Sequence, residues 1–394
     1  MLKPKTLARY DQPVPRYTSY PTAPHFTEAV DATTHARWLA EIPGGDSLSL
    51  YVHIPFCDTM CWFCGCHTRI VNRYEPIAAY LDHVTAEVER VAGTLGKRHR
   101  ASHVHWGGGT PTSLAPADIL RLSDALRTHF DFDEESEFAV ESDPRGVGEE
   151  TIAALGQAGV TRVSLGVQDF SPRVQQAVNR IQPFDETKRV IDSLRSVGIA
   201  EINIDLMYGL PHQGTDELLA TAEKVLELEP ARLALFGYAH VPWMKVHQRM
   251  IDEDALPGTE ARWQQAGAAR AFLEEHGFTT IGLDHFARDD DPMAAALKAG
   301  VLHRNFQGYT TDRANTLIGF GASSISSLPA GYVQNFPQLN LYSRTLDEGR
   351  LPTARGVELT PDDRLRREVI ERLMCDLEID LGQICGEHGE TADA

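Results

Sequence analysis

Four cysteines within ten residues have the types and spacing that could do chemistry. Cys57, Cys61 and Cys64 follow the pattern C-x3-C-x2-C, and Cys66 comes after one further residue. A loop of that length can direct three thiolates at three corners of a cubane, and thiolates are the usual ligands of iron–sulfur clusters. Three ligands leave the fourth iron of a [4Fe–4S] cluster open to a small molecule. We therefore interpret Cys57, Cys61 and Cys64 as metal ligands.

Other interpretations of the cysteines stay open at this stage. A zinc site could use all four, although the gap between Cys64 and Cys66 is shorter than the usual spacing of about two to four residues. Cys66 could instead close the fourth iron, as in an electron-transfer module, or be an ordinary partly buried cysteine. A disulfide framework is disfavoured, because Cys375 and Cys385 are distant from the others and no apolar signal core follows Met1.

Short apolar or alternating runs recur along the chain, and each has the length of a β-strand. They occupy 48–54, 103–106, 137–142, 161–167, 201–207 and 232–238, with helical patterns between them. Gly159, Gly198 and Gly277 each stand just past a helical pattern and before an apolar run. A glycine there can adopt the left-handed conformation that ends a helix. Repeated strand–helix–strand units predict a parallel sheet.

About six right-handed strand–helix–strand units curl into a full or partial barrel, whose active site lies on the loops that leave the strand C-terminal ends. We predict an α/β fold: a partial (β/α)6 TIM-like barrel of parallel strands with an irregular N-terminal arm and a C-terminal extension. The expected divisions are an arm over 1–47, a core over 48–240, a barrel-completing region over 241–345 and a C-terminal helical segment over 346–394. Further strands are expected at 279–284 and 317–325, and a helix at 362–377.

Polar and glycine residues stand where these predicted strands end. The cysteine loop follows the first strand, and the run Gly107–Gly108–Gly109–Thr110 follows the second. Glu141, Gln168 and Asp205 end the third, fourth and fifth. Since parallel strands share one C-terminal edge, we expect these groups to lie close together.

Composition excludes several classes of protein. The chain of 394 residues has 37 Lys+Arg and 56 Asp+Glu, a net charge of −19, and no run of five or six basic residues. A nucleic-acid binder normally displays a basic face, so we expect no nucleic-acid partner. Hydrophobic residues at 42% and charged residues at 24% are typical of a globular protein. No stretch reaches the ~18 apolar residues of a membrane helix, and we expect a cytoplasmic protein.

The motifs together resemble the radical S-adenosylmethionine (SAM) superfamily and, within it, the oxygen-independent coproporphyrinogen III oxidases. Phe63, directly before the third cysteine, supports the broader resemblance. The resemblance to the oxygen-independent coproporphyrinogen III oxidases rests on four segments: residues 51–66, the arm PRYTSYPT at 15–22, HWGGGTPT at 105–112 and NFQGYTT at 305–311. It extends from the arm to about residue 380.

This resemblance implies a reaction. An electron delivered to the cluster cleaves SAM into methionine and a 5′-deoxyadenosyl radical, which takes a hydrogen from the β-carbon of a propionate side chain. Loss of carbon dioxide and one electron then leaves a vinyl group. Two propionates of coproporphyrinogen III are processed to give protoporphyrinogen IX, in anaerobic haem and porphyrin biosynthesis. A flavodoxin-like or other low-potential reductant is implied, and we expect a monomer.

The resemblance also implies two bound SAM molecules, and no catalytic side chain is assigned beyond the cluster. The positions that match the first SAM site or its surroundings are Tyr51, Gly108, Gly109, Thr110, Glu141, Gln168, Arg180 and Asp205. Those that match the second are Phe63, Ala239, Gln307 and Ile325. Each also has an ordinary interpretation, because lone charged residues usually form surface ion pairs and lone apolar residues pack in cores.

The alternative function is a haem chaperone of the same superfamily without decarboxylase activity. Such chaperones commonly lack the counterparts of Cys66 and of the PRYTSYPT arm.

A substrate with four carboxylates needs local basic residues in this acidic chain, and Arg16 is one candidate. His53, His103, His105 and His240 are interpreted as structural, since none has a two-histidine metal spacing. Family members continue past the helix at 362–377, whereas this chain has only a short polar end, expected to be frayed or truncated.

Overall fold

The computed structural model describes residues 6, 9–10 and 18–392. Its centre is a sheet of twelve strands in the order β16-β15-β14-β13-β1-β4-β5-β6-β7-β8-β10-β9. The seven strands from β13 to β8 are parallel. They are β13 (Thr316–Phe320), β1 (Leu48–Ile54), β4 (Ala101–Gly108), β5 (Glu137–Ser142), β6 (Arg162–Gln168), β7 (Glu201–Tyr208) and β8 (Arg232–Gly237). The predicted α/β fold with a parallel sheet is thus confirmed.

Antiparallel strands extend the sheet on both sides. β10 (His285–Arg288) and β9 (Phe278–Ile281) follow β8, and β14 (Ile325–Ser327), β15 (Gly331–Asn335) and β16 (Thr353–Glu358) follow β13. The edge strands β9 and β16 do not pair with each other, so the barrel is partial. Two short pairs lie apart from the sheet: β2 (Phe56–Cys57) with β3 (Arg69–Ile70), and β11 (His303–Arg304) with β12 (Tyr309–Thr310).

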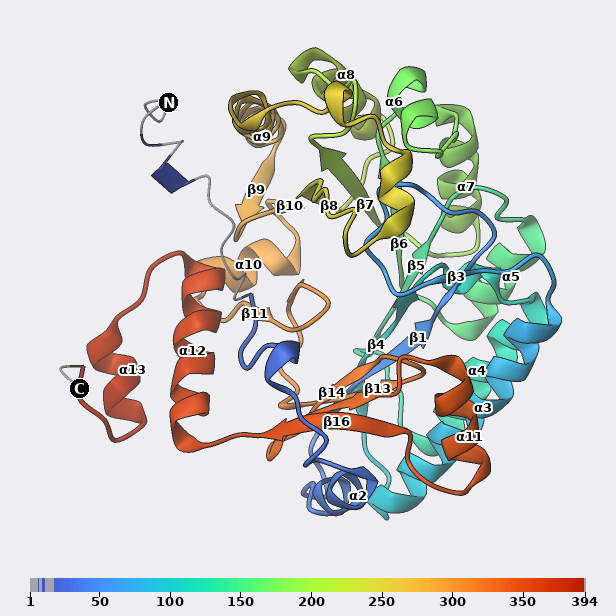
Figure 1. The fold of residues 1–394 in the computed structure, drawn as a ribbon, viewed down its shortest axis with the longest axis vertical. Helices are drawn as coiled ribbons and strands as arrows, with labels where there is room; N and C mark the ends of the chain where they lie inside the picture. The colour runs from blue at the N-terminus through green and yellow to red at the C-terminus, as the bar shows by residue number, and fades with distance from the viewer. Residues whose placement is uncertain (1–5, 7–8, 11–17, 393–394) are drawn as a thin grey trace.

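Helices cover the outer face of the curved sheet (Figure 1). They are α3 (Glu75–Leu95), α4 (Pro116–His129), α5 (Glu149–Ala158), α6 (Pro172–Ala177), α7 (Phe184–Ser196), α8 (Thr215–Leu226) and α9 (Thr259–Glu275). α2 (Ala32–Ala40) and α11 (Leu339–Asp347) lie near β16, while α10 (Pro292–Lys298), α12 (Pro361–Asp376) and α13 (Leu381–Glu387) lie on the open side of the barrel. Single 3-10 turns occupy Ala23–His25, Pro111–Ser113, Val246–Met250 and Glu253–Ala255.

The alternation of side chains along β1 separates the core from the interior of the barrel. Leu48, Leu50 and Val52 are at most 1% exposed and belong to the main hydrophobic cluster. Full burial of such a side chain stabilises the fold by about 1.5–3 kcal/mol. Ser49 and Tyr51 point the other way and line the barrel lumen. The strand therefore anchors the sheet and presents polar groups inside it.

The three glycines expected to end helices do so. Gly159 caps α5, while Gly198 and Gly277 come two residues after the ends of α7 and α9, with φ of +80°, +92° and +83°. This left-handed conformation is strained for residues that carry a Cβ. The predicted helix at 362–377 is α12, shifted by one residue at each end.

Three expectations about local structure were wrong. The run 279–284 is not one strand, because β9 ends at Ile281 and a turn over 282–284 leads into the antiparallel strand β10. The run 317–325 is not one strand, because the chain reverses at Gly321 (φ +93°) and Ser323 (φ +67°), which separates β13 from β14. The N-terminal arm is not wholly irregular, since it contains α2, which Asp31 caps by accepting a hydrogen bond from the Thr34 N–H at 2.9 Å. Prolines lie outside this helix and limit only its extension.

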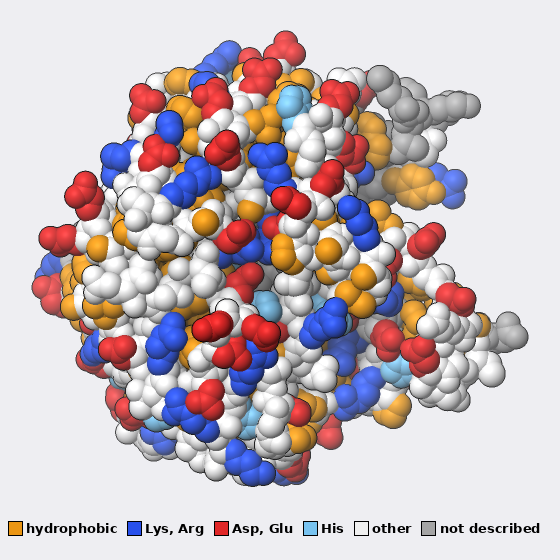
Figure 2. Space-filling view, turned by 180° about the vertical axis from the view of Figure 1, so that it is seen from behind, with side chains coloured by type: hydrophobic (Ala, Val, Ile, Leu, Met, Phe, Trp, Pro, Cys, Tyr) orange, Lys and Arg blue, Asp and Glu red, His pale blue; other side chains and the backbone are white. Residues whose placement is uncertain are grey.

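No helix in the described part of the chain is long and apolar enough to cross a membrane. On the face opposite to that of Figure 1, Lys and Arg side chains are interspersed with Asp and Glu (Figure 2). This mixed pattern agrees with the acidic composition.

Candidate active site

The three cysteines predicted as ligands line one cavity of about 150 Å³, which we call the cluster cavity. Cys57 ends β2, while Cys61 and Cys64 lie in the loop between β2 and β3. β2 and this loop follow β1, at the C-terminal edge of the parallel sheet. Cys66 lines the same cavity and is exposed.

Each of the three sulfurs already receives a hydrogen bond. The Thr68 hydroxyl donates to Cys57 Sγ at 3.3 Å, and the Cys66 N–H donates to Cys64 Sγ at 3.4 Å. Burial raises the pKa of Cys57 to about 11. Hydrogen bonding to Cys66 lowers the pKa of Cys64 to about 6. Such donors can stabilise thiolates, which is the form that binds iron.

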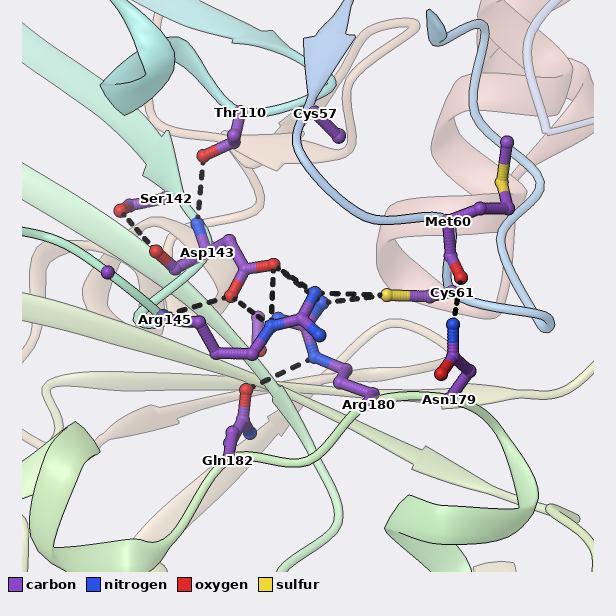
Figure 3. A network of polar contacts seen from close by, with 12 residues as sticks. Cys57, Met60, Cys61, Thr110, Ser142, Asp143, Arg145, Asn179, Arg180 and Gln182 are labelled. Carbon is purple, nitrogen blue, oxygen red and sulfur yellow. Dashed lines mark hydrogen bonds and ion pairs between the residues drawn. The ribbon is translucent and has the colours of Figure 1, made fainter. Parts of the chain in front are cut away.

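The third sulfur belongs to a network of charged groups (Figure 3). Arg145 Nη2 and Arg180 Nη1 each lie 3.3 Å from Cys61 Sγ. The same two guanidiniums pair with Asp143 Oδ2, at 2.6 and 3.1 Å. Burial opposes ionisation of Asp143, but the two arginines outweigh it and hold its pKa below the usual value. Gln182 Oε1 accepts a further bond from Arg180 Nε at 3.1 Å, so the Arg180 side chain is fixed at the cavity wall.

The glycine run after β4 provides close backbone approach to this cavity. A Cβ on Gly109 would overlap the carbonyl oxygen of Phe56, and one on Gly107 would lie 2.7 Å from Glu141 Oε1. Gly108 has φ +116°, and its N–H donates to Glu141 Oε2 at 3.1 Å. Only glycine fits such positions, where a ligand can contact the backbone.

Two partly buried carboxylates line the cavity, and their pKa values are shifted in opposite directions. Burial disfavours the charged form of Glu141, but a 2.9 Å hydrogen bond from His105 Nε2 helps to hold its pKa below the usual value. Burial raises the pKa of Asp205 to about 7, with a further contribution from the charge of Glu141. Glu141 therefore accepts hydrogen bonds as a carboxylate, whereas Asp205 can also donate one near neutral pH. Such a pair suits the hydroxyls of a ligand, which both donate and accept.

A second cavity of about 320 Å³, the lumen cavity, fills the inside of the barrel. It shares Cys66, Glu141, Ser164 and Asp205 with the cluster cavity, so the two adjoin. Its far end carries Arg162, which bonds Asn203 Oδ1 at 2.9 Å, and Arg232, which pairs with Asp291 at 2.9 Å. This end of the lumen is therefore lined by charged and polar side chains. In a closed barrel, branched apolar side chains would fill the corresponding space.

The structure gathers most of the predicted site residues. Phe63, Gly108, Gly109, Glu141, Gln168, Arg180 and Asp205 line the cluster cavity, and Tyr51 and Gln307 line the lumen cavity. Thr110 is buried beside the cluster cavity, where its hydroxyl accepts the Asp143 N–H at 3.0 Å. The Tyr51 hydroxyl and His53 Nδ1 form a hydrogen bond of 2.9 Å.

Two of the residues predicted for a second SAM are joined through a buried side chain. Gln248 Nε2 donates to the carbonyl oxygens of Phe63 and Ala239, at 3.1 and 3.2 Å. Ile325 lies apart, packed on the small cluster that contains Phe26. The structure therefore brings Phe63 and Ala239 together but does not bring Ile325 to the cluster cavity.

Asp143, Arg145 and Gln182 were not predicted from the sequence. A signal was present for Asp143 and Arg145, since both lie within three residues of the end of β5. Arg16, suggested for the substrate, lies outside the described residues.

The residues of the cluster cavity fit a [4Fe–4S] cluster. Among the described residues, no three His, Cys, Asp or Glu side chains converge on a single ion. The thiols of Cys57, Cys61 and Cys64 instead surround a shared cavity, each with its own hydrogen-bond donor. A polynuclear cluster suits this arrangement, because each iron takes its own thiolate.

Comparison with known proteins agrees with this geometry. The model of the Radical SAM superfamily matches residues 51–225. An oxygen-independent coproporphyrinogen III oxidase of Bradyrhizobium diazoefficiens is 53% identical over 384 residues, covering 98% of this chain and 85% of the relative. The enzyme of that name from Paracoccus denitrificans is 47% identical over 389 residues, covering 98% and 86%. The solved structure of coproporphyrinogen III oxidase (HemN) from Escherichia coli, described as a radical SAM enzyme, is 40% identical with a TM-score of 0.92, covering 98% and 87%.

The barrel and its cysteine loop thus define a radical SAM protein. Membership of this superfamily implies a [4Fe–4S] cluster and SAM. Within it, the chain belongs to the family of oxygen-independent coproporphyrinogen III oxidases and is an oxidoreductase.

Proposed function

We propose that this enzyme converts two propionate side chains of coproporphyrinogen III into vinyl groups, giving protoporphyrinogen IX. The observation that carries the proposal is that the cluster cavity adjoins the lumen cavity, with which it shares Cys66, Glu141, Ser164 and Asp205. A SAM molecule in the first can then face a propionate in the second. The relatives are named for coproporphyrinogen III, which supports this substrate. Each propionate loses a hydrogen atom, carbon dioxide and one electron, the last to an external acceptor.

When bound, the cluster and SAM supply a carbon radical able to remove a hydrogen atom from an unactivated carbon. The protein positions the reactants and excludes water. We assign the cluster to Cys57, Cys61 and Cys64, and the methionine carboxylate to Arg180, whose guanidinium suits a carboxylate. The ribose hydroxyls are assigned to the carboxylates of Glu141 and Asp205, which line the cluster cavity.

The remaining residues complete two SAM sites. The first also takes Tyr51, Gly108, Gly109, Thr110 and Gln168, and a second SAM is assigned to Phe63, Ala239 and Gln307, without Ile325, which packs on the cluster that contains Phe26. The bond network of Gln248 supports the joint placement of Phe63 and Ala239. A low-potential, flavodoxin-like protein supplies the electron, and the enzyme acts as a cytoplasmic monomer.

The proposal is tested by anaerobic turnover. The protein, with its cluster reconstituted, is given SAM, a low-potential reductant and coproporphyrinogen III, and all products are identified. We expect 5′-deoxyadenosine, a tricarboxylic intermediate and protoporphyrinogen IX. Cleavage of SAM with the porphyrinogen unchanged would refute the substrate assignment. Stable haem binding without turnover would favour the chaperone function instead.

A further inference from the structure

A third cavity, of about 170 Å³, opens on the side of the barrel, and we call it the side cavity. Its walls come from Thr18–Tyr20 of the N-terminal arm, from the chain between β11 and β13, and from α12. It shares Ser49, Asn305, Thr310, Asp312 and Leu317 with the lumen cavity. The lumen cavity therefore adjoins both the side cavity and the cluster cavity that holds the cysteines.

Three arginines line the side cavity without a carboxylate partner. Arg313 and Arg367 have no hydrogen-bond or ion-pair partner within the described part of the chain. Arg304 Nη1 donates only to backbone carbonyls, those of Thr18 at 2.7 Å and Asn305 at 3.4 Å. Its Nε is buried and has no partner among the same residues. In Figure 2, several basic side chains lie where the C-terminal helices meet the body of the molecule.

The two carboxylates of this cavity are already engaged. Asp312 pairs with His103 at 3.1 Å and accepts from the Ser102 hydroxyl at 3.2 Å. Glu371 pairs with His303 at 2.9 Å. Each carboxylate thus has a histidine, and none of the three guanidiniums, as its side-chain ion-pair partner. This is notable in a chain with a net charge of −19, where carboxylates outnumber basic residues by 56 to 37.

We propose that the side cavity is the carboxylate-recognition site for the substrate, an inference that rests on the proposed function. Arg304, Arg313 and Arg367 bind propionates that are not being processed, while another propionate extends through the lumen toward the cluster cavity. Guanidiniums suit this role because they bind carboxylates with two parallel hydrogen bonds. The site selects a macrocycle with several carboxylates at its rim over one with two.

The experiment measures porphyrin binding by the full chain, with its cluster reconstituted and SAM present, under anaerobic conditions. The probes are coproporphyrin III, the stable oxidised tetracarboxylate, and mesoporphyrin IX, a dicarboxylate. The variants are Arg313→Gln, Arg367→Gln and the double variant. Arg366→Gln is the matched control, because Arg366 is the next residue along α12 but pairs with Asp362 at 2.8 Å and does not line the side cavity. Cluster absorbance and circular dichroism verify folding.

We expect each cavity substitution to weaken coproporphyrin III binding by about tenfold, the effect of losing a charge-assisted bond. The preference for coproporphyrin III over mesoporphyrin IX should fall with it, and Arg366→Gln should change neither. In turnover, KM for coproporphyrinogen III should rise more than kcat falls. Inorganic phosphate at millimolar concentration should compete poorly, since one small anion replaces a single carboxylate of a substrate that carries four.

The outcomes separate this inference from the proposed function. If the folded variants bind coproporphyrin III as the wild type does, the inference is wrong, even when the wild type converts the porphyrinogen. If binding depends on the arginines but the wild type leaves coproporphyrinogen III unchanged, the recognition site stands and the proposed function is wrong. If inorganic phosphate displaced bound coproporphyrin III as effectively as added coproporphyrin III does, the inference would be overturned in favour of a site for free anions.

Discussion

Stability should depend on pH through a buried carboxylate far from the candidate active site. Glu87 on α3 is 1% exposed and has no cationic partner among the described residues. It accepts hydrogen bonds from Gly321 N–H at 2.8 Å, Asn335 Nδ2 at 2.6 Å and the Tyr342 hydroxyl at 2.6 Å. Burial outweighs these bonds and raises its pKa from 4.5 to about 7. The folded protein therefore holds a proton that the unfolded chain has lost over this range.

The sign follows from proton linkage. Because the folded pKa is raised, the stabilisation by Glu87 is complete below pH 4.5 and is lost as pH rises through about 7. A shift of this size corresponds to roughly 3 kcal/mol, most of which is lost between pH 5 and 8. The Glu87→Gln variant keeps the shape of the side chain and removes the ionisation.

The assay is denaturant unfolding of the wild type and Glu87→Gln at pH 5, 6, 7 and 8, with the cluster reconstituted anaerobically. Other titrating groups are common to both proteins, so the difference in unfolding free energy isolates Glu87. We expect the wild type to lose roughly 3 kcal/mol relative to the variant as pH rises. A difference that is constant with pH would refute the reasoning, whatever its size.

Three further predictions concern the site. Cys66→Ser should keep the absorbance of the [4Fe–4S] cluster; its loss would identify a fourth ligand. Asp143→Asn should leave the buried Arg180 without a counter-charge, lowering thermal stability and weakening SAM binding at least tenfold in equilibrium dialysis, since breaking a buried pair costs about 3–5 kcal/mol; unchanged affinity would show that the pair does not position Arg180. Gly109→Ala should destabilise the protein by about 1–3 kcal/mol in denaturant unfolding, because its Cβ would overlap a backbone carbonyl; an equally stable variant would contradict the close approach.

The sequence predicted the parallel part of the fold because its signals are local. Each inner strand is a short apolar run, and Gly159 and Gly198 mark the ends of helical patterns with their positive φ. Topology then placed the strand ends at one edge, which is why Glu141 and Asp205 were expected together and do line the same cavity.

The remaining features depend on contacts between distant segments. The run 317–325 has a continuous strand-like composition, and only the backbone at Gly321 shows the reversal into β14. The pairing of Asp143 with Arg180 joins loops after different strands, and no periodicity predicts such a pair. The side cavity joins the N-terminal arm to α12, segments more than three hundred residues apart.

These long-range contacts also explain how an acidic protein can serve an anionic substrate. Net charge acts over long distances, but salt screens exposed charges beyond about 10 Å. Within that distance a substrate carboxylate meets Arg304, Arg313 and Arg367 rather than the average surface. Asp312 and Glu371, the two carboxylates of this cavity, pair with histidines and not with these arginines. The composition therefore excluded a partner that needs an extensive basic face, while a compact polyanion can still be bound by a few arginines that the fold leaves without counter-charges.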